Sequence, residues 1–252
     1  MGEFNDQVVV VTGGGSGIGK ACAILFGQER AAVVVLDWDE DSAKTTVREI
    51  EAEGGTGLAL KADVGDVQQV KKSIAKTVER LGKIDILFAN AAVQEISPID
   101  STTDEEWERV ISANLKGTFL CCREVIPVMR RRRSGSIIIA SSGHAFQTYA
   151  GYAVYAASKG GQVAMMRAMA IDCARDGIRV NCVIPGATET KLIRAHFENK
   201  PEDKARLLSR IPMGRLATPE DIARSVRMLA SRDAAYITGT SLVVDGGLLA
   251  QG

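Results

Sequence analysis

Three side chains in the second half of the chain have the types and spacing of an acid–base centre for moving a hydride. Tyr155 and Lys159 are four residues apart, and Ser142 precedes Tyr155 by thirteen residues. The alanine-rich segment around the pair predicts a helix, in which positions i and i+4 share one face. Taken alone, the pair also fits two exposed residues of a surface helix.

The chemistry of these groups explains why they would work together. A hydride leaves a carbinol carbon only as its hydroxyl loses a proton, but a free phenol has a pKa of about 10, too high for an efficient base near neutrality. A cation within about 4–6 Å favours the phenolate. We therefore predict that Tyr155 is the general acid/base, that Lys159 supplies the cation and that Ser142 hydrogen-bonds the substrate oxygen.

A glycine-rich turn near the N-terminus predicts a phosphate-binding site. The turn joins a β-branched run at 7–12 to an apolar helical stretch, and Gly13, Gly17 and Gly19 give the spacing G-x-x-x-G-x-G. Free backbone N–H groups and the positive end of the helix would face an anion there, and glycine lets the backbone come close. A merely flexible glycine turn is the alternative interpretation.

The end of the second expected strand, at 32–37, indicates which dinucleotide binds. Asp37 lies eighteen residues beyond Gly19, close to where an acidic residue takes the adenosine ribose hydroxyls. A carboxylate there would repel a 2′-phosphate, and neither Ser16 nor Trp38 is basic. The sequence therefore predicts NAD rather than NADP. The alternative is that Asp37 caps the helix that follows.

The complete set of motifs resembles the classical short-chain dehydrogenase/reductase family over nearly the whole chain. The resemblance implies a nicotinamide-dependent enzyme that interconverts a secondary alcohol and a ketone, and family members are typically tetramers. It rests on motifs that occur in the family's order and spacing: Thr12 to Gly19, Asp63 with Val64, Asn90 to Ala92, Asn114, Ser142, Tyr155 with Lys159, Pro185 with Gly186, and Thr190.

The resemblance also implies roles for single residues. Lys159 would hold the nicotinamide ribose, and Asn114 would bind a water that relays protons toward Lys159, unless it is only a polar residue satisfied in a helix kink. Asp63 would hydrogen-bond the adenine amino group, for which a turn residue is the alternative. The remaining implied cofactor contacts are Ser16, Ile18, Trp38, Val64, Asn90, Ala91, Tyr155, Pro185, Gly186, Thr188 and Thr190.

Strand and helix patterns alternate along the chain and predict a Rossmann-like α/β fold, as a single domain over 1–252. We expect a doubly wound, seven-stranded parallel sheet flanked by helices on both faces. Its ligands would bind beyond the carboxyl ends of the strands, where the candidate residues fall. Strands are expected near 7–12, 32–37, 56–61, 84–89, 135–140, 178–184 and 240–244, and helices near 18–29, 40–53, 66–81, 104–132, 153–176 and 218–230.

The segment 187–212 is the one long irregular stretch, and we predict a substrate lid there, with an ordinary surface excursion as the alternative. The cleft wall is expected to be polar, which favours a small hydroxylated substrate such as a sugar, polyol or hydroxy acid. His144 is the best placed for a substrate hydroxyl, unless it is a loop residue that faces water. The candidate substrate contacts are Gln94, Ser142, His144, Tyr152, Tyr155 and His196.

Two rival functions stay open. A 3-oxoacyl-(acyl-carrier-protein) reductase shows the same overall pattern, but such enzymes usually prefer NADPH, against which Asp37 argues. A non-catalytic NAD-binding regulator would keep the cofactor site and lose the chemistry, whereas Asn114, Ser142, Tyr155 and Lys159 are all present here.

The amino-acid composition narrows the class of protein further. The 252 residues carry no formal net charge and are 46% hydrophobic, so nucleic-acid and membrane partners are not expected. The basic run 130–133 is typical of a solvated helix C-terminus, although an acidic carrier or substrate could use it. Five cysteines without a C-x-x-C pair predict reduced core residues, and two histidines without metal-ligand spacing predict no metal. We expect a cytoplasmic homotetramer.

Overall fold

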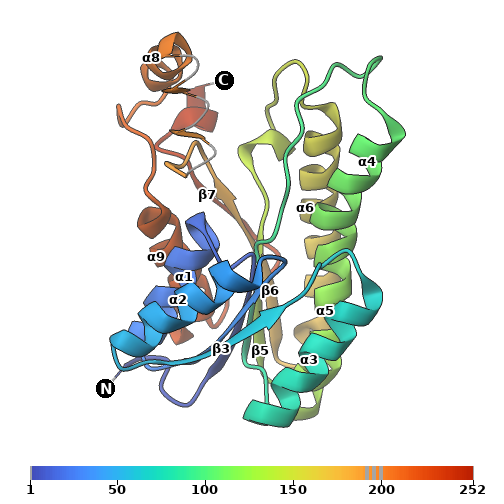
Figure 1. Cartoon of the computed structure of the whole chain (residues 1–252), viewed down its shortest axis with the longest axis vertical. Coiled ribbons are helices and arrows are strands. Elements are labelled where there is room, and N and C mark those ends of the chain that lie inside the picture. Colours follow the sequence, from blue (N-terminus) through green and yellow to red (C-terminus); the bar gives the residue numbers. More distant parts are fainter. Residues whose placement is uncertain (1, 191–192, 195–196, 199–200, 252) are drawn as a thin grey trace.

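The computed structural model describes residues 2–190, 193–194, 197–198 and 201–251. Its centre is one parallel sheet of seven strands in the order β3-β2-β1-β4-β5-β6-β7, with helices on both faces (Figure 1). This arrangement confirms the predicted Rossmann-like, doubly wound fold. The strands are β1 Val8–Thr12, β2 Ala32–Asp37, β3 Thr56–Lys61, β4 Ile86–Ala89, β5 Gly135–Ala140, β6 Ile178–Pro185 and β7 Ser241–Val244.

The helices divide into two layers. Helices α1 (Gly17–Gln28), α2 (Glu40–Ala52) and α9 (Pro219–Ala230) cover one face of the sheet, and α3 (Val67–Leu81), α5 (Gly117–Arg132) and α6 (Ala153–Ala174) cover the other (Figure 1). The central strands β1, β2, β4 and β5 are rich in Val, Ile and Leu because both of their faces are buried. In β1, Val8 and Val10 pack into one core, whereas Val9 and Val11 pack into the other.

Local signals explain where several helices begin. Asp39 accepts from backbone N–H groups at the start of α2, and Asp66 does so at the start of α3. Thr103 opens α4 (Asp104–Val110) and Thr218 opens α9, each through a capping box. These caps satisfy donors that the first helical turn leaves unpaired.

The helix predicted at 104–132 is continuous but not uniform. It consists of α4, a π-helical turn η1 (Ile111–Lys116) and α5. In η1 the N–H of Gly117 bonds the carbonyl of Ser112, five residues earlier, instead of the usual four. Such a turn widens the helix and often occurs at functional sites, and here it contains Asn114.

The five cysteines are free and buried, as predicted, and burial raises the pKa of each thiol. The basic run ends α5, where Arg130 pairs with Asp176 at 2.6 Å and Arg133 donates to the carbonyl of Arg175. Within the described ranges, no helix is long and apolar enough to cross a membrane, and no three acidic, histidine or cysteine side chains form a metal cluster.

Candidate active site

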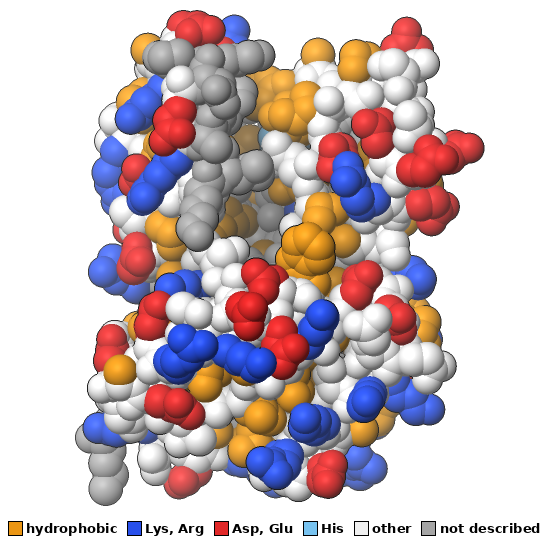
Figure 2. Space-filling view, in the orientation of Figure 1, with side chains coloured by type: hydrophobic (Ala, Val, Ile, Leu, Met, Phe, Trp, Pro, Cys, Tyr) orange, Lys and Arg blue, Asp and Glu red, His pale blue; other side chains and the backbone are white. Residues whose placement is uncertain are grey.

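A cleft of about 1410 Å³ opens beyond the carboxyl ends of the strands. The space-filling view shows the molecule hollowed there, with hydrophobic side chains in the upper part of the opening (Figure 2). Nearly all the residues proposed from the sequence line it. They include Gly13, Ser16, Gly17, Ile18, Asp37, Trp38, Asp63, Val64, Asn90, Ala91, Gln94, Ser142, His144, Tyr152, Tyr155, Lys159, Pro185, Gly186, Thr188 and Thr190.

The glycine turn follows β1 and packs too closely for side chains. Gly13 has φ +62°, and a Cβ at Gly19 would lie 2.1 Å from the carbonyl oxygen of Gly13. Ser16, which precedes α1, makes no side-chain cap bond, so its hydroxyl leaves the first N–H groups of the helix untaken. The turn therefore offers backbone N–H donors and the positive end of α1 to an anion. Such close packing is not expected of a merely flexible glycine turn, which was the alternative interpretation.

Asp37 is buried where β2 ends. One carboxylate oxygen accepts from the N–H of Gly15 at 2.9 Å and the other from the N–H of Asp39 at 3.0 Å. Asp39, not Asp37, caps α2, so the helix-capping alternative for Asp37 is wrong. Trp38 leaves 79% of its surface exposed and lines the same end of the cleft.

Two other residues proposed as cofactor contacts also organise the loops. Asn90 donates from its side chain to the carbonyls of Thr12 and Gly13, which ties the loop after β4 to the glycine turn. Asp63 accepts from the N–H of Gly65 at 2.8 Å, as the turn alternative predicted, and it also lines the cleft. Each side chain therefore shapes the cleft wall as well as bordering it.

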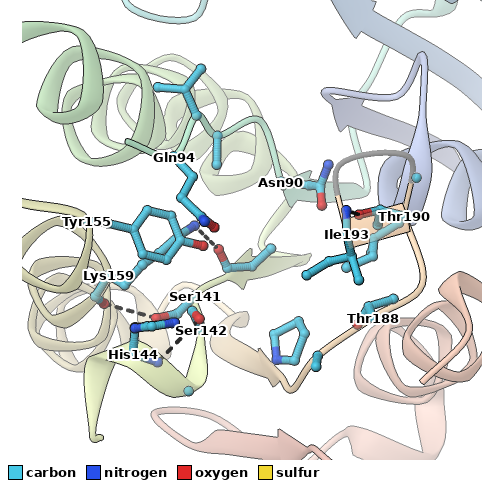
Figure 3. Close-up of a pocket in the computed structure, with 18 of the residues that line it drawn as sticks. Asn90, Gln94, Ser141, Ser142, His144, Tyr155, Lys159, Thr188, Thr190 and Ile193 are labelled. Carbon is cyan, nitrogen blue, oxygen red and sulfur yellow. Dashed lines mark hydrogen bonds between the residues drawn. The ribbon is translucent and has the colours of Figure 1, made fainter. Parts of the chain in front are cut away.

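The candidate acid–base residues meet on one wall of the cleft. Figure 3 shows Tyr155, Lys159, Ser142 and His144 on one side of the pocket, and Asn90, Thr188 and Thr190 on the other. The ammonium of Lys159 lies 5.5 Å from the centre of the Tyr155 ring and donates to the carbonyl of Ala140 at 2.8 Å. The pair is therefore a contact within the site and not two exposed residues of a surface helix.

Burial sets the protonation of this pair. It raises the pKa of Tyr155 to about 12, an effect that Ser142 opposes, and lowers the pKa of Lys159 to about 8. A low-dielectric site disfavours both the phenolate and the ammonium when each is considered alone. Near neutrality both groups therefore carry their protons, and the phenol of Tyr155 has one to donate.

A group of stacked rings, which we call the aromatic wall, consists of His144, Tyr149, Tyr152 and Tyr155. The His144 ring stacks on Tyr152 at 4.4 Å and meets Tyr149 and Tyr155 edge-on, each at 5.5 Å. Burial lowers the pKa of His144, which favours the neutral imidazole. His144 packs into the wall and lines the cleft, and its contact with a substrate hydroxyl stays a prediction.

Known proteins match this chain over its whole length. A family model described as enoyl-(acyl carrier protein) reductase covers residues 13–249. The 3beta-hydroxysteroid dehydrogenase 1 of Eggerthella lenta is 40% identical over 248 residues, which are 98% of this chain and 95% of that protein. The 3-oxoacyl-(acyl-carrier-protein) reductase of Thermotoga maritima is 39% identical over 249 residues, or 98% and 99%. A solved structure from Burkholderia xenovorans, described as a short-chain dehydrogenase/reductase, has a TM-score of 0.96 at 31% identity and full coverage of both chains.

The chain belongs to the short-chain dehydrogenase/reductase family. It is an oxidoreductase that acts on CH–OH groups and ketones, and the family implies a nicotinamide cofactor. The relatives named here carry substrates of different kinds in their names, so family membership alone leaves the substrate open.

In this short-chain dehydrogenase/reductase, Asn114 supports the site from behind and does not line the cleft. Its side chain accepts from the N–H of Val93 at 2.8 Å, and it donates to the carbonyl of Val93 at 2.9 Å and to the hydroxyl of Ser158 at 3.0 Å. These bonds agree with the alternative interpretation of Asn114, in which it is a polar residue whose hydrogen bonds are satisfied within a helix kink. Asn114 thereby fixes the loop after β4 against α6.

Some features of the site lay beyond the sequence prediction. Gln162 is buried and donates to the carbonyl of Asn114 and to the hydroxyl of Thr118, each at 2.8 Å, while its own side-chain oxygen has no partner among the described residues. The available signal was a Gln among the small and apolar residues of the segment 160–166. His196, a candidate substrate contact, lies outside the described residues. Gly19 does not line the cleft, because it packs against Gly13.

We expect Asn114→Leu to lower the free energy of unfolding by about 1–3 kcal/mol, because it leaves the N–H and carbonyl of Val93 without partners. The measurement is urea-induced unfolding followed by circular dichroism. Ser112→Ala, on the same π-helical turn, is the matched control and should change the unfolding free energy by less than about 1 kcal/mol. Equal stability of the Asn114→Leu and wild-type proteins would show that these bonds do not hold the loop.

Proposed function

We propose that this enzyme transfers a hydride between NAD and the carbinol carbon of a small hydroxylated substrate, such as a sugar, polyol or hydroxy acid. The observation that carries the proposal is the presence, in one cleft, of a buried carboxylate at Asp37 and an acid–base pair at Tyr155 and Lys159. The first selects a cofactor without a 2′-phosphate, and the second handles the substrate proton.

The residues present fit a dinucleotide. The glycine turn has no space for side chains, so a ligand in the cleft would meet its backbone directly, and the methyl of Thr190 lies 3.3 Å from where a Cβ of Gly17 would stand. We assign the pyrophosphate to this turn, with Ser16, Gly17, Ile18 and Thr190 around it. Asp37, Trp38, Asp63, Val64, Asn90 and Ala91 would border the adenosine, and Pro185, Gly186 and Thr188 the nicotinamide.

The nicotinamide, when bound, supplies or accepts the hydride. The phenolate of Tyr155 takes the hydroxyl proton of the substrate during oxidation, and the resulting phenol returns that proton during reduction. Lys159 stabilises the phenolate by its charge, and Ser142 donates a hydrogen bond to the substrate oxygen on which charge develops. Asn114 keeps the loop after β4 in place against α6, the helix that carries Tyr155.

Polar atoms on the aromatic wall support a small hydroxylated substrate, although apolar residues such as Leu248 and Leu249 also line the cleft. His144, Tyr149 and Tyr152 offer one ring nitrogen and two hydroxyls around the reacting position, and Gln94 donates to the Tyr152 hydroxyl at 3.5 Å. The candidate contacts among the described residues are therefore Gln94, Ser142, His144, Tyr152 and Tyr155. The segment 187–212, which includes α8 (Pro201–Ser209), would close over them as a lid.

A 3-oxoacyl-(acyl-carrier-protein) reductase is the second candidate, favoured by the name of the Thermotoga maritima relative. The carboxylate of Asp37 argues against the NADPH that such enzymes usually prefer. A non-catalytic NAD-binding regulator is a weaker candidate, because such a protein has no need of the buried ammonium of Lys159 beside Tyr155.

We also propose a homotetramer in the cytoplasm. The long helices α5 and α6 expose Phe119 and Ile171, to 44% and 80% of their surfaces, which a neighbouring subunit would cover. Cys121, Cys122 and Met166 on the same helices pack in the core of this chain and need no neighbour.

The test is the initial rate of change in absorbance of the reduced nicotinamide with purified enzyme. NAD⁺ and NADP⁺ would each be offered with sugars, polyols, hydroxy acids and simple secondary alcohols. We expect turnover with NAD⁺ on one polar class. Turnover restricted to 3-oxoacyl thioesters with NADPH would replace the proposal by the second candidate, and binding of NAD without any turnover would favour the regulator.

A further inference from the structure

One arginine in the cleft lacks an acidic partner among the described residues. Of the three arginines that line it, Arg109 pairs with Glu95 and Arg206 pairs with Asp203 at 3.0 Å. Arg210 forms no ion pair with any described residue, and its hydrogen bond goes to the hydroxyl of Tyr149 at 2.8 Å. A guanidinium has five N–H donors, so most of those on Arg210 are left for a ligand.

The position of Arg210 is fixed by an aromatic ring and not by charge. Its guanidinium carbon lies 5.0 Å from the centre of the Tyr149 ring, so a cation–π contact adds to the hydrogen bond. Arg210 is only half-buried and follows α8, whose residues Asp203, Arg206 and Leu207 also line the cleft. The planar fork is thus held ready at the cleft wall, which reduces the entropy cost of binding an anion.

The aromatic wall relates this cation to the reacting position. Tyr155 contacts the rings of His144 and Tyr152, and these two contact Tyr149, on which Arg210 lies. A substrate whose carbinol carbon faces Tyr155 would therefore reach Arg210 only with a group several bonds away. Asp245 also lines the cleft, but its carboxylate accepts from the N–H groups of Gly247 and Leu249 and forms no ion pair with Arg210.

We propose that Arg210 is a specificity-determining residue that binds an anionic group, best a carboxylate, on the part of the substrate remote from the carbinol carbon. A carboxylate matches the guanidinium fork with two parallel hydrogen bonds. This inference rests on the proposed function and narrows its substrate class to hydroxy acids in which the two groups are separated by a chain.

The test compares secondary hydroxy acids with their primary amides. The probes are 3-hydroxybutanoate, 4-hydroxypentanoate and 5-hydroxyhexanoate, each beside its amide, with NAD⁺. We expect wild-type enzyme to prefer the acids, and more so as the chain lengthens. Arg210→Gln should lower kcat/KM for the preferred acid by about 10- to 100-fold, mainly through KM, and leave the amides within about threefold.

Three further variants sharpen the result. Arg210→Lys keeps the charge without the fork and should recover part of the loss. Tyr149→Phe removes the hydroxyl that holds Arg210 and should give an intermediate loss. Arg224→Gln removes a charge from α9, away from the cleft lining, and should change neither the acids nor the amides.

Failure of this inference is separable from failure of the proposed function. Equal efficiency on acids and amides, unchanged in Arg210→Gln, would overturn the role of Arg210 while hydride transfer stands. If no alcohol in the panel is oxidised, calorimetric titration of the NADH-loaded protein with 5-oxohexanoate tests whether Arg210 binds an anion. Binding that Arg210→Gln weakens about 10-fold or more supports the anion site, whereas absent or unchanged binding rejects it.

Discussion

Tyr155→Phe is expected to lower kcat by about 10²- to 10⁴-fold, the range that a positioned general acid/base contributes. The substitution removes only the hydroxyl, so the ring keeps its contacts with His144 and Tyr152. The substrate hydroxyl then has no group to take its proton as the hydride departs. The measurement is the initial rate of NADH formation at saturating substrate.

Tyr152→Phe is the matched control, because it removes a phenol of the same wall that does not contact Lys159 in the structure. We expect it to change kcat by less than about tenfold, since a lost hydrogen bond to substrate costs about 0.5–1.5 kcal/mol. Binding of NADH, followed by quenching of tryptophan emission, should be the same in both variants. A Tyr155→Phe enzyme that retains most of its turnover would remove the acid/base assignment.

The pH dependence follows from the same two residues. Burial disfavours the ammonium, so the pKa of Lys159 falls to about 8 and the cation is lost as pH rises through that value. Burial also raises the pKa of Tyr155 to about 12, so the phenol stays protonated across this range. Ketone reduction needs both protons and should be fastest below pH 8 and decline above it. A reduction rate that rises between pH 7 and 9 would contradict this assignment.

The sequence predicted the strands better than it predicted the long helix. The valine-rich run of β1 predicted a strand buried on both faces, and the two cores meet its alternate residues. The pattern at 104–132 predicted one helix and could not reveal the π-helical turn at Ile111–Lys116. Asn114 within that turn bonds Val93 and Ser158, which are distant in sequence and which a local pattern does not reveal.

The site was predictable to the extent that each residue acts through a local motif. Tyr155 and Lys159 share a helix, and the glycine turn lies within one strand–turn–helix unit, so spacing alone brought each together. The dual attachment of Asn90 to Thr12 and Gly13 arises between β1 and β4, which pair in the sheet but are far apart in the chain. Arg210 was missed because a lone arginine in a loop shows its lack of an acidic partner only when its neighbours in space are known.

Replacing Asp37 by Ser together with Trp38 by Arg is expected to reverse the cofactor preference. The ratio of kcat/KM for NAD⁺ to that for NADP⁺ should fall by about 10²- to 10⁴-fold, because two charge-assisted hydrogen bonds to the ribose are lost and an arginine–phosphate contact is gained. The wild-type protein should favour NAD⁺ because the buried carboxylate of Asp37, which accepts from the N–H groups of Gly15 and Asp39, would repel a 2′-phosphate.

The control for this reversal is Asp39→Asn, which removes a charge two residues away. Asp39 accepts from the N–H groups of Asp41 and Ser42 at the start of α2, and an asparagine can keep that cap. We expect Asp39→Asn to change the cofactor ratio by less than about threefold, since a surface charge is screened within a Debye length of about 10 Å. If Asp39→Asn shifts the ratio as much as the double variant does, cofactor choice depends on the general charge of this turn and not on a specific bond from Asp37. A wild-type preference for NADP⁺ would reject the role of Asp37 outright, because its carboxylate would then have to accommodate the phosphate it is expected to repel.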